Sequence, residues 1–236
     1  MFRHCIHHHC TSLCHLCGLP LPSLNQTIWC PHCLNYFQPS PRCLRCGLPT
    51  LAETSLCGQC LSSPPPWQRL FCVGDYQFPL SGYIHQLKHQ QKPELSRDLA
   101  YLLAPRISQP APLITCVPLH WKRQLKRGFN QSERLSYYLS RELIRSGYPT
   151  RLDSRLFKRI KATPPQQGLD KKERESNLKD AFVLRHSPLY SHVAIVDDVV
   201  TTGSTIRHLC SQLLDVGVKT IDIYCVCRTP EPSSER

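Results

Sequence analysis

The sequence predicts an α/β fold, a parallel sheet flanked by helices, with a small N-terminal zinc-ribbon module. Three observations support this prediction. Eight cysteines form four Cys-x-x-Cys pairs within the first sixty residues, and apolar segments with strand and helix periods alternate from residue 70 onward. One apolar run also leads directly into paired aspartates and a hydroxyl-rich loop. The 236 residues, 41% of them hydrophobic, suffice for one large or two small domains.

The chain is strongly basic, with 29 Lys and Arg against 17 Asp and Glu and a formal charge of +12. Such an excess favours polyanions such as nucleic acids, or phosphorylated substrates, although solubility alone also explains part of it. No apolar run approaches the length of a membrane span, and the N-terminus lacks the apolar core of a secretory signal. We therefore expect a cytoplasmic protein.

The first sixty residues contain a duplicated pattern of cysteine knuckles. Cys14-His-Leu-Cys17-Gly-Leu-Pro is repeated as Cys43-Leu-Arg-Cys46-Gly-Leu-Pro. Each is followed by a second pair, Cys30-Pro-His-Cys33 and Cys57-Gly-Gln-Cys60. Two residues between cysteines let both thiolates of a turn face one ion, and two such turns complete a tetrahedral site. In a reducing compartment this pattern indicates metal rather than disulfides.

Structural Zn²⁺ is the expected occupant, in two sites with sequential ligands. The expected ligands are Cys14, Cys17, Cys30 and Cys33 for one site and Cys43, Cys46, Cys57 and Cys60 for the other. Interleaved ligation stays open. An iron–sulfur cluster also takes four thiolates, but knuckle pairs in which the first is followed by glycine resemble zinc ribbons more closely. The upstream cluster of Cys5, His7, His8, His9 and Cys10 is assigned no role.

The segment Ser62-Ser-Pro-Pro-Pro-Trp67 marks a domain boundary, because three consecutive prolines form neither a helix nor a central strand. We expect a double zinc ribbon over residues 1–63 and an α/β domain over residues 67–236. Hydrophobic periodicity in the second domain predicts strands over residues 70–76, 113–117 and 220–227 and helices over residues 81–89, 94–104 and 130–145. Asn130 is the expected N-cap of the last of these helices.

Two polar segments of the second domain have open interpretations. The segment from Pro118 to Gln131 carries Lys122, Arg123, Lys126 and Arg127. These cations follow a strand end, where they would contact pyrophosphate or nucleic acid, or else form a solvated basic loop. The later segment, residues 161–177, is polar and contains prolines, which is typical of a mobile lid.

The stretch from His192 to Ile206, HVAIVDDVVTTGSTI, carries the clearest chemistry. A buried strand is expected to end at Asp197 and Asp198, and a loop with hydroxyl side chains and Gly203 then opens a helix with apolar residues Ile206, Leu209, Cys210, Leu213 and Leu214. Backbone N–H groups at such a helix start suit a phosphate, and Gly203 allows its close approach. The two carboxylates would accept hydrogen bonds from sugar hydroxyls. The pattern therefore favours a ribose 5-phosphate site.

This stretch resembles the phosphoribosyl pyrophosphate (PRPP) motif of type I phosphoribosyltransferases, which implies a phosphoribosyltransferase-like fold. The resemblance implies that Asp197 and Asp198 contact the ribose 2- and 3-hydroxyls. It implies phosphate binding by Val199, Val200, Thr201, Thr202, Gly203, Ser204 and Thr205.

The order of motifs along the whole chain is similar to that of the ComF/GntX family of competence-associated proteins. The double zinc ribbon precedes Arg127-Gly-Phe-Asn130-Gln, then Gln167-Gly-Leu with Arg174 and Asn177, then the PRPP motif. The resemblance implies a role in uptake or use of external DNA, a cytosolic location, and partners in the transformation machinery such as competence helicase-type proteins. Arg127, Asn130, Arg174 and Asn177 match family motifs and are candidate pyrophosphate, lid or DNA contacts.

Two functions remain open from the sequence. In the first, the protein is a transferase that binds PRPP with Mg²⁺ and passes ribose phosphate to a nitrogen nucleophile. In the second, the same site grips phosphates without transfer, and the zinc ribbons and basic segment hold single-stranded DNA or a helicase-like partner.

Overall fold

The computed structural model describes residues 12–21, 27–161 and 181–229. The chain forms two compact units, Met1–Pro39 and Ser40–Arg236. The predicted division into residues 1–63 and 67–236 stays a prediction, and these units differ from it because the second cysteine tetrad belongs to the unit that contains the sheet. Within the described segments, no helix combines the length and the apolar character that crossing a lipid bilayer requires.

The first unit contains little regular structure in its described part. Helix α1 (Pro31–Leu34) is followed by a 3₁₀ turn, η2 (Asn35–Phe37). Trp29 and Phe37 are buried, and their ring centroids lie 4.9 Å apart. One aromatic pair and four cysteines are a small core, so metal binding is expected to supply much of the folding free energy of this unit.

The second unit is built on a five-stranded parallel sheet in the order β1-β7-β6-β2-β3. Its strands are β1 (Arg69–Asp75), β2 (Leu113–Cys116), β3 (Arg151–Leu152), β6 (His192–Val200) and β7 (Thr220–Arg228). Residues 193–196 of β6 are completely buried, because a parallel strand is covered on both faces. The prediction of an α/β fold with a parallel sheet flanked by helices is confirmed.

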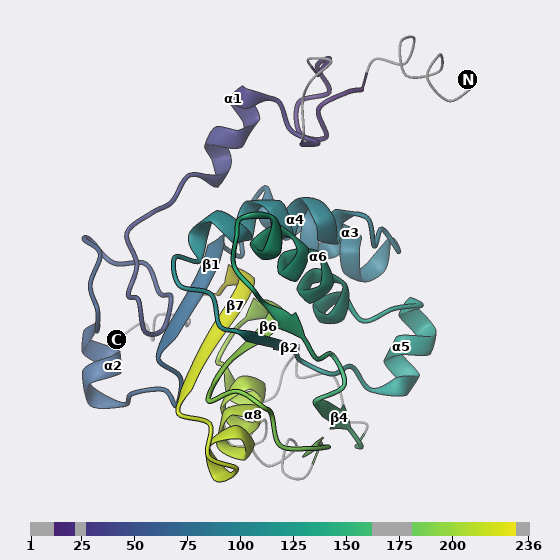
Figure 1. The fold of residues 1–236 in the computed structure, drawn as a ribbon. Coiled ribbons are helices and arrows are strands. Elements are labelled where there is room, and N and C mark those ends of the chain that lie inside the picture. The colour runs from purple at the N-terminus through teal and green to yellow at the C-terminus, as the bar shows by residue number, and fades with distance from the viewer. Residues whose placement is uncertain (1–11, 22–26, 162–180, 230–236) are drawn as a thin grey trace, which may run out of the picture. The chain divides into compact units, whose positions relative to one another are not determined.

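Helices cover both faces of this sheet (Figure 1). Helices α3 (Leu80–His89), α4 (Leu95–Leu103) and α6 (Gln131–Arg145) lie along one face, and α8 (Ser204–Asp215) lies on the other. The predicted apolar stripes are buried, including Leu87, Leu99, Leu135 and Leu209. Leu214 is an exception, since 42% of it is exposed and it faces away from the core that Leu213 enters.

Asn130 caps α6 as predicted, with its Oδ1 accepting a hydrogen bond from the backbone N–H of Ser132 at 3.1 Å. The interpretation of residues 118–131 as a loop is corrected in part. Residues Trp121–Arg127 form a short helix, α5, which the His120 side chain caps and which Gly128 ends with φ +82°. A separate two-stranded antiparallel sheet of β4 (Phe157–Arg159) and β5 (Phe182–Leu184) follows α6 and β3.

Candidate functional site

A cavity of about 230 Å³ opens where β2 and β6 end. Parallel α/β sheets bind ligands at this edge, since the loops that follow neighbouring strands converge there. The walls come from α3, the segment after β2, the start of α6, β4 and the loop between β6 and α8. The polar lining comprises Lys88, Arg123, Arg127, Asn130, Gln131, Ser132, Arg159, Asp197, Asp198, Thr201, Thr202, Ser204 and Thr205.

One wall of this cavity is the predicted phosphate loop, residues 201–205, which connects β6 to α8. Gly203 is the N-cap of the helix with φ +74°, a conformation that costs glycine little and other residues more. Side chains order the loop, since Thr202 Oγ1 and Ser204 Oγ are 2.8 Å apart. The loop therefore presents hydroxyls and the positive end of a twelve-residue helix to the cavity.

The acidic pair lies at the carboxyl end of β6. Asp197 is half-buried and its Oδ1 accepts a hydrogen bond from Ser132 Oγ at 2.8 Å. Asp198 is 6% exposed, and its Oδ2 lies 2.7 Å from the ammonium of Lys88 on α3. Alternation along the strand directs the two carboxylates to different neighbours, so each meets a donor from a different helix.

The environment of the pair changes its protonation. Burial and the neighbouring Asp198 raise the pKa of Asp197 to about 7, against opposing effects of Lys88 and Ser132. Burial lowers the pKa of Lys88, but the adjacent Asp198 carboxylate raises it above its ordinary value. Lys88 therefore stays charged beside the two aspartates. Asp197 gains or loses its proton near neutral pH.

Three arginines line the cavity. Arg123 and Arg127 belong to α5, and Arg159 ends β4 with its guanidinium 5.1 Å from the Phe182 ring centroid. Burial and the nearby Arg123 charge lower the pKa of Arg159 to about 10. Burial also lowers the pKa of Arg127, where Asp198 and Arg123 act in opposite directions. These cations repel one another in a cavity that is partly shielded from water, so a bound polyanion would stabilise them.

The structure brings most of the predicted phosphate-site residues into one cavity. Asp197, Asp198, Arg123, Arg127, Asn130 and residues 199–205 all line it. Lys122 does not line it, and the side chain of Lys126 and the residues Arg174 and Asn177 lie outside the described part of the chain. Their roles stay predictions.

Sequence reasoning missed Lys88, Arg159 and Ser132. Lys88 and Arg159 are single cations in a basic chain, and only the fold carries them to the acidic pair. Ser132 had a local signal, because it follows the predicted cap Asn130 by two residues and faces the same strand end.

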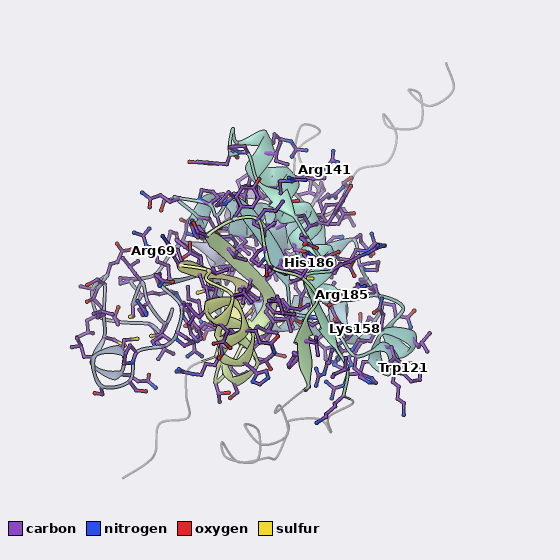
Figure 2. The ribbon with its side chains drawn as sticks, turned by 60° about the horizontal axis from the view of Figure 1, so that its bottom comes forward. Arg69, Trp121, Arg141, Lys158, Arg185 and His186 are labelled. Atoms are coloured by element: carbon purple, nitrogen blue, oxygen red, sulfur yellow. The ribbon has the colours of Figure 1, made fainter. Side chains whose placement is uncertain are left out.

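A second polar surface lies outside the cavity. Trp121 is 58% exposed, and the Lys122 ammonium lies 5.6 Å from its ring centroid. Lys158 of β4 and Arg185, the residue after β5, are also exposed. Figure 2 shows Trp121, Lys158 and Arg185 on one side of the molecule, and Figure 1 places α5 and β4 on that side too. We call these four residues the Trp121 surface.

The cysteines gather in two tetrads with sequential ligands. Cys14, Cys17, Cys30 and Cys33 form the first tetrad, and Cys43, Cys46, Cys57 and Cys60 form the second, each with its four sulfurs within 4.8 Å of one another. Thiolates around one Zn²⁺ at about 2.3 Å lie about 3.8 Å apart in a tetrahedron. The observed Sγ–Sγ distances include 3.8 Å for Cys17–Cys30, 3.9 Å for Cys43–Cys60 and 3.6 Å for Cys46–Cys57. Both tetrads could hold structural zinc.

Backbone N–H groups also favour thiolates in the knuckles. Cys30 N donates to Cys14 Sγ and Cys57 N donates to Cys43 Sγ, both at 3.3 Å. Burial raises the pKa of Cys43, but such donors outweigh it and bring that pKa to about 7. The same balance brings the pKa of Cys14 to about 6. The first cysteine of each tetrad is thus prepared to ligate a metal.

Several known proteins are similar to this chain over most of its length. A protein-family model for the phosphoribosyl transferase domain matches residues 132–236. DNA utilization protein YhgH of Escherichia coli O6:H1 is 41% identical over 226 residues, covering 92% of this chain and 97% of that protein. Its counterpart from Salmonella typhi matches equally well, with the same identity and coverage.

Competence protein F of Haemophilus influenzae is 37% identical over 211 residues, covering 84% of this chain and 90% of that protein. A purine phosphoribosyltransferase structure from Pyrococcus horikoshii matches 61% of this chain and 91% of its own chain at 20% identity, with a TM-score of 0.34. With relatives this similar over most of its length, the chain belongs to the ComF family of competence and DNA-utilization proteins with a phosphoribosyl transferase domain.

Proposed function

We propose that the cavity at the ends of β2 and β6 binds PRPP, or ribose phosphate, and that this binding serves the use of external DNA. The observation that carries the proposal is the pairing of a phosphate loop with a carboxylate pair and three arginines in one cavity of about 230 Å³. A loop at a helix start suits the 5-phosphate, and the arginines that line the same cavity suit pyrophosphate. The names of the relatives, DNA utilization and competence proteins, support the proposed cellular role.

Different polar groups of the cavity would contact different parts of the ligand. Residues 201–205 would bind the 5-phosphate through backbone N–H groups and hydroxyls. Asp197 and Asp198 would accept hydrogen bonds from the ribose hydroxyls. Arg123, Arg127 and Arg159 would contact the pyrophosphate. Two carboxylates are hard oxygen donors that fit Mg²⁺, which supplies charge neutralisation for the pyrophosphate when it is bound.

Isothermal titration of the zinc-loaded protein with PRPP and ribose 5-phosphate, with and without Mg²⁺, tests the proposal. Gly203→Ala should abolish binding of both ligands, because a Cβ there would lie 2.9 Å from the Trp67 ring and the backbone has φ +74°. Gly217→Ala is the matched control, since Gly217 also has a positive φ, +91°, but lies beyond α8 with no atom near its Cβ position. Wild-type protein that binds neither ligand under these conditions would overturn the proposal.

Single-stranded DNA binding at the Trp121 surface is a second proposed function. An exposed indole beside the Lys122 cation, with Lys158 and Arg185 exposed on the same side of the molecule, could stack bases while cations neutralise the backbone phosphates. Measuring DNA affinity as a function of salt concentration tests this second function separately from ligand binding in the cavity.

A further inference from the structure

The phosphate loop contacts two buried side chains from outside its own helix, and both also donate hydrogen bonds to backbone carbonyls of the Cys43–Cys46 knuckle. Arg228, the last residue of β7, pairs with Val200 in the sheet and is 5% exposed. Its Nη1 donates to the carbonyls of Thr201 and Val200, the latter at 3.2 Å. Its Nε donates to the carbonyl of Cys46 at 2.9 Å. One guanidinium thus joins the start of the loop to a metal-ligand residue.

Trp67 makes a parallel connection. The indole is 2% exposed, and its ring lies so close to Gly203 that an added Cβ would be 2.9 Å from it. Its Nε1 donates to the carbonyl of Arg45 at 2.7 Å. The guanidinium of Arg207, on the first turn of α8, lies 5.4 Å from the ring centroid. The same ring therefore packs on the loop and is fixed by the knuckle.

The knuckle that offers these two adjacent carbonyls is itself docked on the sheet. Leu70 N of β1 donates to the Leu44 carbonyl at 3.0 Å. A Cβ at Gly47 would lie 2.3 Å from Leu70 Cδ2, so the turn after Cys46 packs directly against the strand. Arg42 forms an ion pair of 2.9 Å with Asp75 at the end of β1. None of these contacts involves the carbonyls of Arg45 and Cys46. The orientation of these two carbonyls therefore depends on the turn that the thiolates close around a metal ion.

We infer that the second tetrad positions the phosphate loop, with Arg228 and Trp67 as the positioning residues that connect the Cys43–Cys46 knuckle to residues 200–203. This inference rests on the proposed phosphate site. Ligand thiolates fix the direction of the knuckle carbonyls, and these carbonyls fix the two side chains behind the loop. The first tetrad has the same ligand set but belongs to the other compact unit, so it serves as an internal control.

Full-length variants broken in one tetrad at a time test this inference. Cys57→Ser should weaken ribose 5-phosphate binding at least about tenfold, because displacing the phosphate-binding groups from their positions lowers the affinity by at least that factor. It should also speed amide hydrogen exchange over residues 200–206. Cys17→Ser should change neither quantity, although both variants should lose one zinc ion by mass spectrometry.

Two conservative variants keep the test decisive if Cys57→Ser folds poorly. Arg228→Lys keeps the charge but cannot donate to the Cys46 and Thr201 carbonyls together, and Trp67→Phe keeps a ring on Gly203 without the donor to Arg45. Both should show weaker binding and faster loop exchange with the full zinc content retained. Unchanged exchange and affinity in these variants would overturn the inference. Hydrogen exchange needs no ligand, so a wild type that binds no ribose phosphate would overturn the proposed function while this readout still decides the coupling.

Discussion

The ammonium of Lys88 lies 2.7 Å from Oδ2 of Asp198, at the ribose end of the proposed phosphate site. The carboxylate is almost fully buried and the lysine side chain is 25% exposed, so the pair is poorly screened by water. Lys88 therefore places a permanent positive charge beside the acidic pair from α3, an element outside the strand–loop–helix motif. It lets both aspartates lie in one cavity at neutral pH.

Replacing Lys88 by Met should destabilise the protein by on the order of 3 kcal/mol, because it leaves the Asp198 carboxylate buried without its cation. Lys88→Arg should retain most of the stability, since a guanidinium keeps the charge. Urea denaturation at pH 7.5 measures both free energies of unfolding. Equal stability of the Met variant and the wild type would mean that the ion pair contributes nothing net to folding.

The contribution of Asp197 to the free energy of unfolding should decrease as pH rises from about 4 to about 7. The pKa of Asp197 in the folded protein, about 7, exceeds the ordinary aspartate value of 3.8, so the folded state holds the proton more tightly in this window. The penalty is absent below the lower value and complete above the higher one. Asp197→Asn should flatten this part of the profile, and Lys88→Met should move it to higher pH. Denaturation curves at pH 4–8 measure it, and a slope unchanged in Asp197→Asn would contradict the assignment.

Local sequence signals predicted the elements that the site is built on. The apolar run of β6, the aspartates and Gly203 are contiguous, so their strand–loop–helix arrangement follows from backbone preferences alone. Asn130 was predicted as a cap for the same reason, because capping depends on the residues of one helix turn. The four knuckles were equally readable, since ligand spacing is local.

What the sequence did not reveal depends on tertiary contacts or weak periodicity. Helix α5 has no apolar stripe, and its Leu125 is 75% exposed, so hydrophobic spacing could not indicate it. Lys88 and Arg159 reach the acidic pair only through the packing of α3 and β4. The docking of the second tetrad was hidden in the same way. Trp67 ends a proline-rich segment that was expected to mark a domain boundary, yet its indole donates a hydrogen bond to the knuckle.

The zinc content of the fully loaded, reduced protein should be two ions per chain, because the two tetrads are separate. Cys17→Ser and Cys57→Ser should each reduce it to one. Native mass spectrometry counts the ions, and one ion per wild-type chain would contradict two sequential sites. Chelation should also lower the thermal midpoint of the sheet-containing unit, because that unit includes the second tetrad.

Affinity for single-stranded DNA should fall steeply with salt, and the Trp121 surface should account for that slope. Each phosphate contact that is removed lowers the slope of log K against log salt by about 0.7 for single strands. The triple variant Lys122→Glu, Lys158→Glu, Arg185→Glu should therefore flatten the slope by about 2. Trp121→Ala should instead weaken binding by about 1–3 kcal/mol at every salt concentration, because stacking is uncharged.

Arg123→Gln and Arg127→Gln are the controls for this titration, since both arginines line the cavity. They should weaken PRPP binding while leaving most of the DNA affinity in place. Fluorescence anisotropy of a labelled oligonucleotide between about 50 and 200 mM salt spans the range in which such contacts change affinity strongly. If the cavity variants abolish DNA binding and the Trp121 surface variants do not, the phosphates of DNA enter the cavity itself. The two proposed functions would then be a single site in which PRPP and DNA compete, and added PRPP would displace the oligonucleotide.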